Sequence, residues 1–458
     1  MGTDIGLSVV IPAWQEGPNL SLLLPELRGV LDALGVAWEV VVVIRDKDPA
    51  TDAAAATIGA RVVRQQHPGY GGALRAGFAE ARGGYILTMD ADLSHRPSFI
   101  DDLWQQRAAA DVTIASRYVP GGRADMPPTR KVLSRVLNTF FGRGLAMPVR
   151  DLSSGFRLYR AEVVRGVDFP ARDFDILQQI LLHAYNEGWR IREVPFAYAP
   201  RRHGSSHARV LAFGRAYLRT FWSLWWRRNS ILAADYDSRA YDSRIPLQRY
   251  WQRSRYRHVT NLIAGQGAVL DVGCGSSRII GALPAGSVGV DVLRRKLRYA
   301  RRFGTPLVEG SGFALPFPNA SFPCVLCSEV IEHVPKTSPI LDELDRTLAP
   351  GGRLVLGTPD YARREWTTIE TLYGKVAPGG YADEHISHYT RDELIGLFRD
   401  RGYRLEATHY IARSELILAF RKLPAAVGTG LNESVGGIEA TRSAERVKVG
   451  DGSRNGAG

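Results

Sequence analysis

The chain has 458 residues, too many for one ordinary hydrophobic core and enough for two domains and a tail. Hydrophobic residues make up 45% and charged residues 23%, which excludes a fibrous or wholly disordered protein. The formal net charge of +12 favours an anionic partner, such as nucleic acid, phosphorylated lipid, an acidic membrane face or a nucleotide. There is no charged and then apolar leader and no run of about 18 uncharged apolar residues, so we expect neither secretion nor a membrane span.

The N-terminal part alternates between strand and helix patterns. Apolar runs predict buried strands, at residues 7–13, 36–44, 60–65, 85–90, 110–118 and 189–196. Helical patterns lie between them, at residues 19–35, 73–83, 130–144 and 176–188. This alternation predicts a parallel sheet whose ligands bind at the carboxyl ends of the strands.

Residues 208–228 form an aromatic-rich helical pattern with two unlike faces. The first face carries Val210, Phe213, Tyr217, Phe221, Leu224 and Trp225, and the opposite face carries Arg215, Arg219 and Ser223. Such a helix can lie in a membrane interface, or it can pack on the sheet or on a second domain. Taken alone, the pattern leaves both placements open, although the arginines exclude a spanning helix.

A second alternation follows and predicts another α/β domain. Its strand patterns lie at residues 268–273, 287–292, 306–310, 324–330, 353–359, 404–410 and 415–422. We therefore expect two consecutive α/β domains, at residues 1–228 and 261–422, with residues 229–260 as a linker or first helix of the second domain. The composition from residue 423 to 458 predicts a disordered tail.

Asp90 and Asp92 end an apolar strand at the edge of the first sheet where ligands bind. Two carboxylates two residues apart can hold a hard divalent cation together with donor phosphate oxygens. The cation would neutralise charge that builds on a nucleotide-diphosphate leaving group. Most Asp-x-Asp pairs are ordinary turn residues, but the preceding strand and the following LSHRP favour a metal site here.

Six segments occur in a recognisable order: VVIPAWQEGPNL, GYGGALRAGF, MDADLSHRP, ASRYVPGG, LSSGFRLYR and EVPFAYAPRRHGSS. Over residues 7–228 this set resembles the family 2 inverting glycosyltransferases of the dolichyl-phosphate mannosyltransferase type. The resemblance implies a GT-A-like domain in which Asp90 and Asp92 hold Mg²⁺ or Mn²⁺. It also implies that the donor base and ribose contact Pro12, Glu16 and Asp46, and that donor or acceptor phosphates contact Arg117, Arg130 and Arg201.

Two residues depart from that family's pattern. Arg45 stands where the acidic stretch after the second strand has an acid, which leaves the choice between guanine and uracil open. His207 stands where a lysine is frequent, so a phosphate contact there would depend on pH.

The resemblance implies direct displacement at the anomeric carbon with inversion. A polyprenyl phosphate acceptor would need no strong general base, because its oxyanion is already a nucleophile, whereas a sugar hydroxyl would need one. A lipid acceptor favours the membrane-interface placement of residues 208–228. We therefore expect a cytoplasmic protein that is peripheral at the inner face of the membrane.

The segment AVLDVGCGSS is a glycine-rich turn after a strand. Gly273 and Gly275 allow a sharp turn and a close approach of the backbone to a ligand. Asp291 follows Gly275 by sixteen residues, the spacing of an acid that binds ribose hydroxyls. Ser277 replaces the third glycine of the dinucleotide fingerprint, which argues against NAD.

Residues 236–422 resemble class I S-adenosylmethionine-dependent methyltransferases of the small-molecule type, through VLDVGCGSS, GVDV, ALPFPNASF, CSEVIEHV, LAPGGRLVLGTP and HYTRDELIGLF. The resemblance implies a Rossmann-like domain that binds S-adenosylmethionine. Its contacts would be Asp271, Gly273 and Gly275 around the methionine part, Asp291 on the ribose, and Ser311 and Phe313 near the adenine. Ser311 and Pro323 each replace a frequent aspartate, so a degenerate domain is an alternative.

Acidic and histidine residues are concentrated in the segments that we expect at the methyl-acceptor end of this domain: Glu329, Glu332, His333, Glu384, His385 and His388. His333 and His385 are the leading candidates to deprotonate an acceptor hydroxyl, and a purely structural role is the alternative for each.

Our main interpretation is a bifunctional enzyme that glycosylates a polyprenyl phosphate or related acceptor and methylates a sugar or lipid-linked intermediate. A second interpretation makes the C-terminal domain a non-catalytic binding module. A third, suggested by charge alone, is a nucleic-acid-binding or nucleic-acid-modifying protein, but no RNA-binding signature accompanies the basic residues. We expect no nucleic acid partner.

Overall fold

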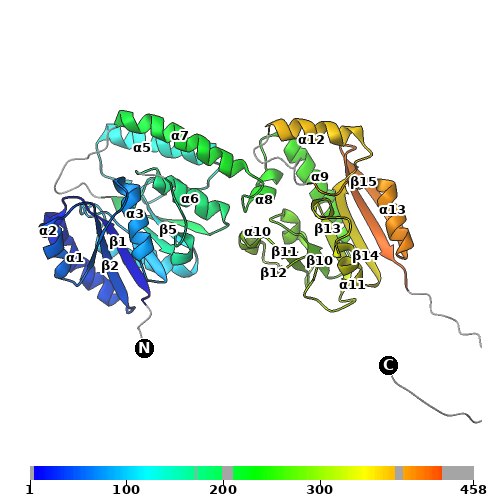
Figure 1. Cartoon of the computed structure of the whole chain (residues 1–458), viewed down its shortest axis with the longest axis horizontal. Coiled ribbons are helices and arrows are strands. Elements are labelled where there is room, and N and C mark those ends of the chain that lie inside the picture. Colours follow the sequence, from blue (N-terminus) through cyan, green and yellow to red (C-terminus); the bar gives the residue numbers. More distant parts are fainter. Residues whose placement is uncertain (1–4, 171–172, 199–209, 377–384, 425–458) are drawn as a thin grey trace, which may run out of the picture. The chain divides into compact units, whose positions relative to one another are not determined.

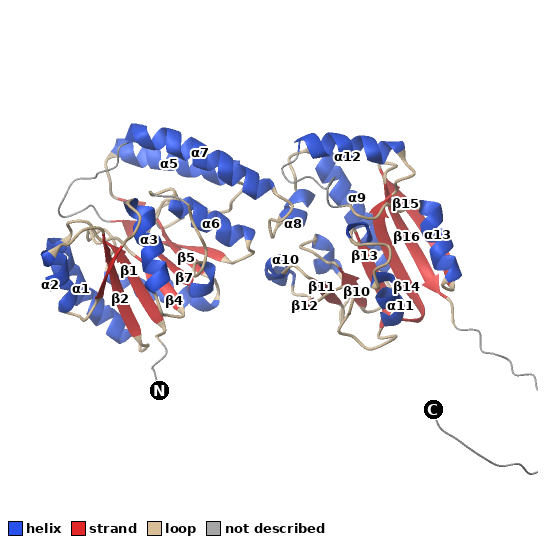
Figure 2. Ribbon diagram, viewed as in Figure 1, coloured by secondary structure: helices blue, strands red, loops and turns tan. Residues whose placement is uncertain are grey.

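The computed structural model describes residues 5–170, 173–198, 210–376 and 385–424. It contains two seven-stranded sheets, each with helices on both faces, and a two-stranded pair (Figure 2). The predicted fold class, two consecutive α/β domains, is confirmed.

The N-terminal domain holds the elements up to α7. In chain order they are β1 (Leu7–Pro12), α1 (Gly17–Ala33), β2 (Trp38–Ile44), α2 (Pro49–Ala56), β3 (Arg61–Arg64), α3 (Gly69–Glu80), β4 (Tyr85–Thr88), α4 (Ile100–Gln105), β5 (Val112–Ser116), β6 (Arg123–Ala124), α5 (Pro128–Gly144), β7 (Arg157–Arg160), α6 (Ile176–Asn186), β8 (Ile191–Pro195), β9 (Ala197–Tyr198) and α7 (Val210–Asn229).

The first sheet is mixed, with the order β3-β2-β1-β4-β7-β5-β8. The expectation of a wholly parallel sheet was wrong at one strand, because β7 runs antiparallel to both β4 and β5. Arg157, fully buried in β7, interrupts the apolar pattern that would mark a central strand. Its guanidinium is held by the carbonyl oxygens of Leu152 and Leu177, at 2.8 and 2.9 Å.

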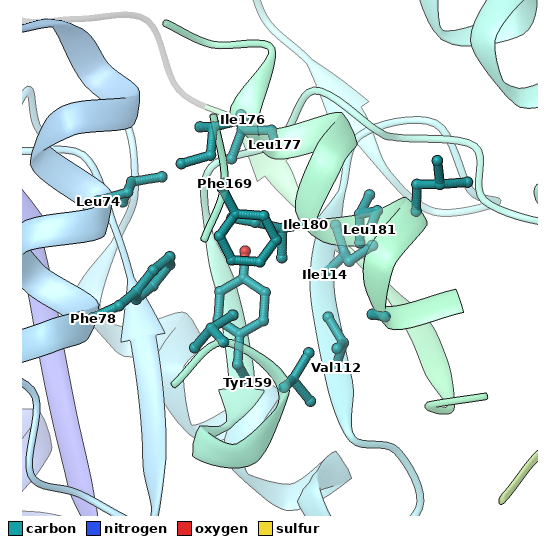
Figure 3. Close-up of a cluster of buried hydrophobic side chains, with 14 of the residues drawn as sticks. Leu74, Phe78, Val112, Ile114, Tyr159, Phe169, Ile176, Leu177, Ile180 and Leu181 are labelled. Carbon is teal, nitrogen blue, oxygen red and sulfur yellow. The ribbon is translucent and has the colours of Figure 1, made fainter. Parts of the chain in front are cut away.

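Alternating side chains of the strands build a separate core on each face of this sheet. Val9 and Ile11 of β1 join the core that α1, α2 and α4 cover, whereas Val10 joins the core with α3, α5 and α6. Figure 3 shows part of the second core, in which Phe78 of α3 and Tyr159 of β7 meet edge to face at 5.9 Å between ring centroids. Because both faces are covered, the strands read as continuous apolar runs.

The C-terminal domain begins with two helices in the segment that we expected to be a linker or first helix. Its elements are α8 (Tyr236–Tyr241), α9 (Pro246–Ile263), β10 (Val269–Val272), β11 (Val288–Asp291), α10 (Arg294–Ala300), β12 (Leu307–Glu309), β13 (Phe322–Ser328), α11 (Ile340–Thr347), β14 (Leu348–Pro359), α12 (Arg364–Val376), α13 (Arg391–Asp400), β15 (Tyr403–Ile411) and β16 (Glu415–Lys422). Val259 and Ile263 of α9 pack on one face of the sheet. The expected tail lies outside the described residues after Pro424.

The second sheet has the order β12-β11-β10-β13-β14-β16-β15 (Figure 2). Strands β10 to β14 are parallel, and β16 is antiparallel to β14 and β15. The carboxyl ends of β10, β11 and β13 therefore meet at one edge of the sheet. Ligands of such sheets bind at this edge.

Candidate active sites

The paired carboxylates of the N-terminal domain follow β4 directly. Asp92 is 4% exposed, and its Oδ1 accepts hydrogen bonds from the backbone N–H of Ser94, at 3.1 Å, and from the Ser94 hydroxyl. Leu93, which lies between Asp92 and Ser94, has a φ of +64°, a left-handed conformation that non-glycine residues rarely adopt. The turn therefore carries backbone strain at the point that orients Asp92, as turns in functional sites often do.

Asp90 is held by two residues to which the sequence assigned no role. The hydroxyl of Tyr70, on α3, donates to Asp90 Oδ1 at 3.2 Å, and the Asp90 backbone N–H donates to His95 Nδ1 at 2.9 Å. Burial, and then the charge of Asp90, raise the pKa of Tyr70 well above its usual value, so the phenol keeps its proton. A Cβ on Gly155 would lie 2.6 Å from this hydroxyl, which favours glycine at that position.

The two carboxylates open into a cavity of about 1300 Å³. Six residues with predicted metal or donor contacts line it: Pro12, Glu16, Asp90, Asp92, Arg117 and Arg130. Asp46 is not among the described lining residues. It is exposed, and its carboxylate lies 3.8 Å from the guanidinium of Arg45, which does line the cavity. Arg201 and His207 lie outside the described residues.

Part of the cavity wall is apolar and comes from α5, where Leu133, Val136, Leu137 and Phe140 line the space. Val136 and Phe140 are also 59% and 43% exposed at the surface of the helix. One continuous cavity therefore has a charged region at the carboxylates and an apolar region that reaches the protein surface.

Arg117 is the most firmly fixed cation in the cavity. Its Nε and Nη2 each donate to a different oxygen of buried Asp151 at 2.8 Å, and Nη2 also donates to Ser153 Oγ at 2.7 Å. Burial opposes the charge on Arg117, but the hydrogen bonds and charge of Asp151 raise its pKa overall. Nη1 takes part in none of these contacts, so the guanidinium can present it to a ligand.

The aromatic-rich helix, which the sequence could place either at a membrane interface or against the protein, is α7. It lies beside α5 (Figure 1). Phe221 and Leu224 are 8% and 1% exposed in the domain core, and the Phe221 ring centroid lies 4.5 Å from that of Phe140 on α5. The expectation that this face meets lipid is therefore wrong for these two residues. Trp222 and Trp226 are instead 57% and 53% exposed. Among the described helices, none is long and apolar enough to cross a membrane.

In the C-terminal domain, the glycine-rich turn follows β10. Gly273 has a φ of +74°, and a Cβ there would lie 2.2 Å from Cγ2 of Val330, so the position needs glycine for both reasons. Asp291 Oδ2 accepts from the Gly275 N–H at 2.8 Å, and its Oδ1 accepts from the Leu293 N–H at 2.7 Å. Asp291 thus fixes the turn at the edge where a ribose would bind.

Asp271 lies buried in β10 beneath this turn. Burial, and then the charge of Asp291, raise its pKa to about 7. A bound cationic group, such as the ammonium or sulfonium of S-adenosylmethionine, would offset the cost of this buried charge.

Asp237 of α8 is a site residue that the sequence patterns did not reveal. Its Oδ2 accepts from the backbone N–H of Ser276 at 3.1 Å and from the Ser276 hydroxyl at 3.0 Å, and it pairs with Lys296 Nζ at 3.0 Å. The signal is weak in the sequence because Asp237 is far from the glycine turn along the chain. These contacts place α8 beside the glycine-rich turn.

The residues expected near the adenine follow β12. The Ser311 hydroxyl accepts from the Phe313 backbone N–H at 3.1 Å, and Phe313 is 42% exposed. Asp291 and Glu309 are paired in register on β11 and β12, so this loop begins beside the predicted ribose site. The arrangement is compatible with a stacking contact from Phe313.

The acidic and histidine residues gather at the end of β13 and just before α13. The rings of His333 and His385 lie 4.9 Å apart. Burial raises the pKa of Glu329 and of Glu332, and Glu329 also lies 3.0 Å from the guanidinium of Arg255. Glu384 lies outside the described residues, whereas the His388 ring stacks on Tyr361 at 4.0 Å.

Comparison with known families divides the chain in the same way. The description of glycosyl transferase family 2 matches residues 8–167, and that of a methyltransferase domain matches residues 270–356. A solved structure of a SAM-dependent methyltransferase from Thermotoga maritima, a possible histamine N-methyltransferase, covers 38% of this chain and 91% of its own at 22% identity and a TM-score of 0.33.

Three curated proteins resemble the N-terminal part. A dolichol-phosphate mannosyltransferase of Pyrococcus furiosus is 34% identical over 44% of this chain, which spans only 58% of that relative. A polyprenol monophosphomannose synthase of Mycolicibacterium smegmatis is 33% identical over 43% of this chain and 79% of its own. An undecaprenyl-phosphate mannosyltransferase of Micrococcus luteus is 32% identical over 47% of this chain and 93% of its own. The chain therefore belongs to glycosyl transferase family 2 and carries a methyltransferase domain in its C-terminal part.

Proposed function

We propose that the N-terminal domain transfers a hexose, with mannose the first candidate, from a nucleotide-diphosphate donor to a polyprenyl phosphate with inversion. The observation that carries this proposal is the single cavity of about 1300 Å³ that joins Asp90 and Asp92 to the apolar face of α5. A polyprenyl phosphate has this same division between a charged head and an apolar chain. The relatives are named for dolichol, polyprenol and undecaprenyl phosphates, which supports the same acceptor class.

The residues present fit a divalent cation, since Asp90 and Asp92 supply carboxylate oxygens. Hydrogen bonds from Tyr70 and Ser94 hold these two carboxylates in place. The cation, when bound, supplies charge neutralisation at the departing diphosphate. Arg117, fixed by Asp151, would hold a phosphate oxygen through Nη1, and Arg130 would contribute a second charge. The acceptor phosphate brings its own oxyanion, so the site needs no strong general base.

The exposed faces of α5 and α7 support a location at a lipid surface. Val132 and Val136 on α5 are 63% and 59% exposed, and Trp222 and Trp226 on α7 are 57% and 53% exposed. Exposed tryptophans accompanied by arginines are typical of a helix that lies at a membrane interface. We place the protein peripherally at the inner face of a membrane, with these two helices toward the lipid.

For the C-terminal domain we propose methyl transfer from S-adenosylmethionine to a sugar or lipid-linked intermediate. The glycine turn, Asp291 and buried Asp271 support this function. The alternative is a non-catalytic binding module. Calorimetric titration of the whole chain with S-adenosylmethionine and with S-adenosylhomocysteine, beside methyl-transfer assays, separates the two readings.

A screen of nucleotide sugars tests the glycosyltransferase proposal. The purified chain is incubated with GDP-mannose, UDP-glucose and related donors, a short polyprenyl phosphate, and Mn²⁺ or a chelator. We expect one donor to give a polyprenyl-phosphate sugar that requires the metal. If every donor fails to label the lipid, the polyprenyl proposal is wrong, and a hydroxyl acceptor with a catalytic base becomes the better reading.

A further inference from the structure

Three side chains of the C-terminal domain converge outside the cofactor turn. Glu332 and His333 lie on the short turn after β13, and His385 precedes α13. One potential ligand atom from each lies within 4.8 Å of the others. The backbone carbonyl of Glu332 accepts from the N–H groups of Ile386 and Ser387, at 2.8 and 2.9 Å, which fixes the segment of His385 against this turn.

Glu332 brings a carboxylate oxygen that has no protein partner in the described structure. The side chain is fully buried, and Oε2 accepts from the hydroxyl of Thr358 at 3.1 Å, but Oε1 makes no hydrogen bond. A buried carboxylate with an unsatisfied oxygen is costly. A cation placed between this carboxylate and the two imidazoles would remove that cost.

His385 is oriented as metal-binding histidines are. Its Nδ1 lies 2.9 Å from Glu370 Oε1 and 2.8 Å from the hydroxyl of Tyr361. Donation of the Nδ1 proton to the Glu370 carboxylate selects the tautomer whose lone pair is on Nε2. A carboxylate behind a ligating histidine is the usual outer partner of such sites, and it strengthens the histidine as a ligand.

The cluster is adjacent to the proposed methyl donor. Strands β13 and β10 are parallel neighbours, with Cys327 opposite Val272, so the turns after them lie at the same edge of the sheet. Val330, two residues before Glu332, occupies the space that a side chain on Gly273 would need. A ligand at the cluster would therefore lie beside the glycine turn.

We propose that Glu332, His333 and His385 bind a divalent transition-metal cation that coordinates the methyl acceptor through a hydroxyl oxygen. Two imidazoles with one carboxylate suit Zn²⁺, Fe²⁺ or Co²⁺ better than Mg²⁺ or Ca²⁺. The acceptor class is then a hydroxyl compound, such as a sugar with neighbouring hydroxyls. His333 and His385 are metal ligands in this arrangement, rather than the general bases that the sequence suggested.

The role in catalysis rests on the proposed methyltransferase function. The metal lowers the pKa of the bound hydroxyl, which loses its proton to solvent. The oxygen forms a bond to the methyl carbon of the sulfonium while the carbon–sulfur bond breaks. An O-methyl product and S-adenosylhomocysteine result, so atoms and charge balance without another reactant.

The test uses Mn²⁺ binding to the untagged full-length chain, followed by electron spin-echo spectroscopy, which detects nitrogen ligands. The nitrogen signal separates this cluster from the oxygen ligands of Asp90 and Asp92. We expect a nitrogen-coordinated Mn²⁺ that Zn²⁺ displaces, and a loss of that signal in His385→Gln. His409→Gln is the matched control, because His409 lies on β15, stacks on His258 and is not one of the clustered residues.

Glu370→Gln tests the tautomer and guards against misfolding of the His385 variant. Glu370→Gln should weaken the binding of Mn²⁺ by about 10- to 100-fold while leaving the circular dichroism spectrum unchanged. An absent nitrogen signal, or one that persists in His385→Gln, would overturn the metal site. S-adenosylmethionine titration of the same samples is independent, so nitrogen-coordinated Mn²⁺ without cofactor binding would overturn the proposed methyl transfer and not the metal site.

Discussion

Carboxylates lie in unlike surroundings in the two domains. In the N-terminal domain, Asp90 and Asp92 border a wide cavity of about 1300 Å³ with arginines around it. In the C-terminal domain, burial raises the pKa of both Asp271 and Glu332. The first arrangement leaves room for a hydrated cation and a diphosphate, whereas the second favours ligands that bring positive charge with little water.

This contrast explains how one chain can serve two chemistries. Transfer of a sugar from a diphosphate needs negative charge to be neutralised in a space large enough for donor and acceptor together. Transfer of a methyl group from a sulfonium needs an environment that accepts a positively charged donor.

The largest effect should come from Asp92→Asn, which keeps the shape of the side chain and removes its charge. We expect sugar transfer to fall by about 100- to 1000-fold, because the cation loses a carboxylate ligand at the leaving group. Asp101→Asn on the exposed face of α4 is the control. Binding of S-adenosylmethionine should be unchanged, and transfer within a few-fold of the parent would remove Asp92 from the metal site.

A second large effect is expected from Gly273→Ala. The new Cβ would meet Val330 Cγ2 at 2.2 Å at a φ of +74°, so the turn must shift. We expect affinity for S-adenosylmethionine, measured by calorimetry, to fall at least tenfold, or about 1.4 kcal/mol. Gly396→Ala on α13 is the matched control, since no atom lies within 4 Å of its Cβ position. Equal losses in both variants would show that the turn has no special role.

Asp271→Asn tests the buried charge through pH. The folded-state pKa of about 7 exceeds the usual 3.8, so the folded protein binds more protons than the unfolded chain between these values. Stability therefore falls as pH rises through this window and levels off above it. We expect Asp271→Asn to raise the melting temperature of the cofactor-free chain more at pH 8 than at pH 5, by scanning calorimetry. A difference that does not change with pH would show that Asp271 ionises normally.

The smallest effect should be that of Trp222→Ala with Trp226→Ala. Both side chains are more than half exposed, so the pair should leave stability nearly unchanged. Binding to vesicles that contain anionic lipid, measured by co-sedimentation, should weaken several-fold. Leu22→Ala, 55% exposed on α1, is the control, and equal binding by all three proteins would place the lipid contact elsewhere.

The sequence predicted those strands and site residues that local patterns of residues mark. Apolar runs marked most strands of both sheets, and Asp90, Asp92, Gly273, Gly275 and Asp291 stand where strands end. It failed at β7, because buried Arg157 breaks the apolar pattern and finds its partners in carbonyl groups that only the fold brings close.

The supporting residues could not be predicted for the same reason. Tyr70 meets Asp90 and Asp237 meets Ser276 across long stretches of chain, so no spacing marks either contact. The aromatic face of α7 was visible, but Phe221 packs on α5, and only the folded helix pair shows which side remains exposed.

The central claim is that a phosphate oxygen of a lipid is the sugar acceptor. The most direct measurement compares a short polyprenyl phosphate with its dephosphorylated alcohol, at equal concentration, with one radiolabelled nucleotide sugar and Mn²⁺. We predict label in the organic phase with the phosphate and none with the alcohol. Equal labelling of the alcohol would contradict this account, because transfer to a hydroxyl would require a general base that we have not placed in the cavity.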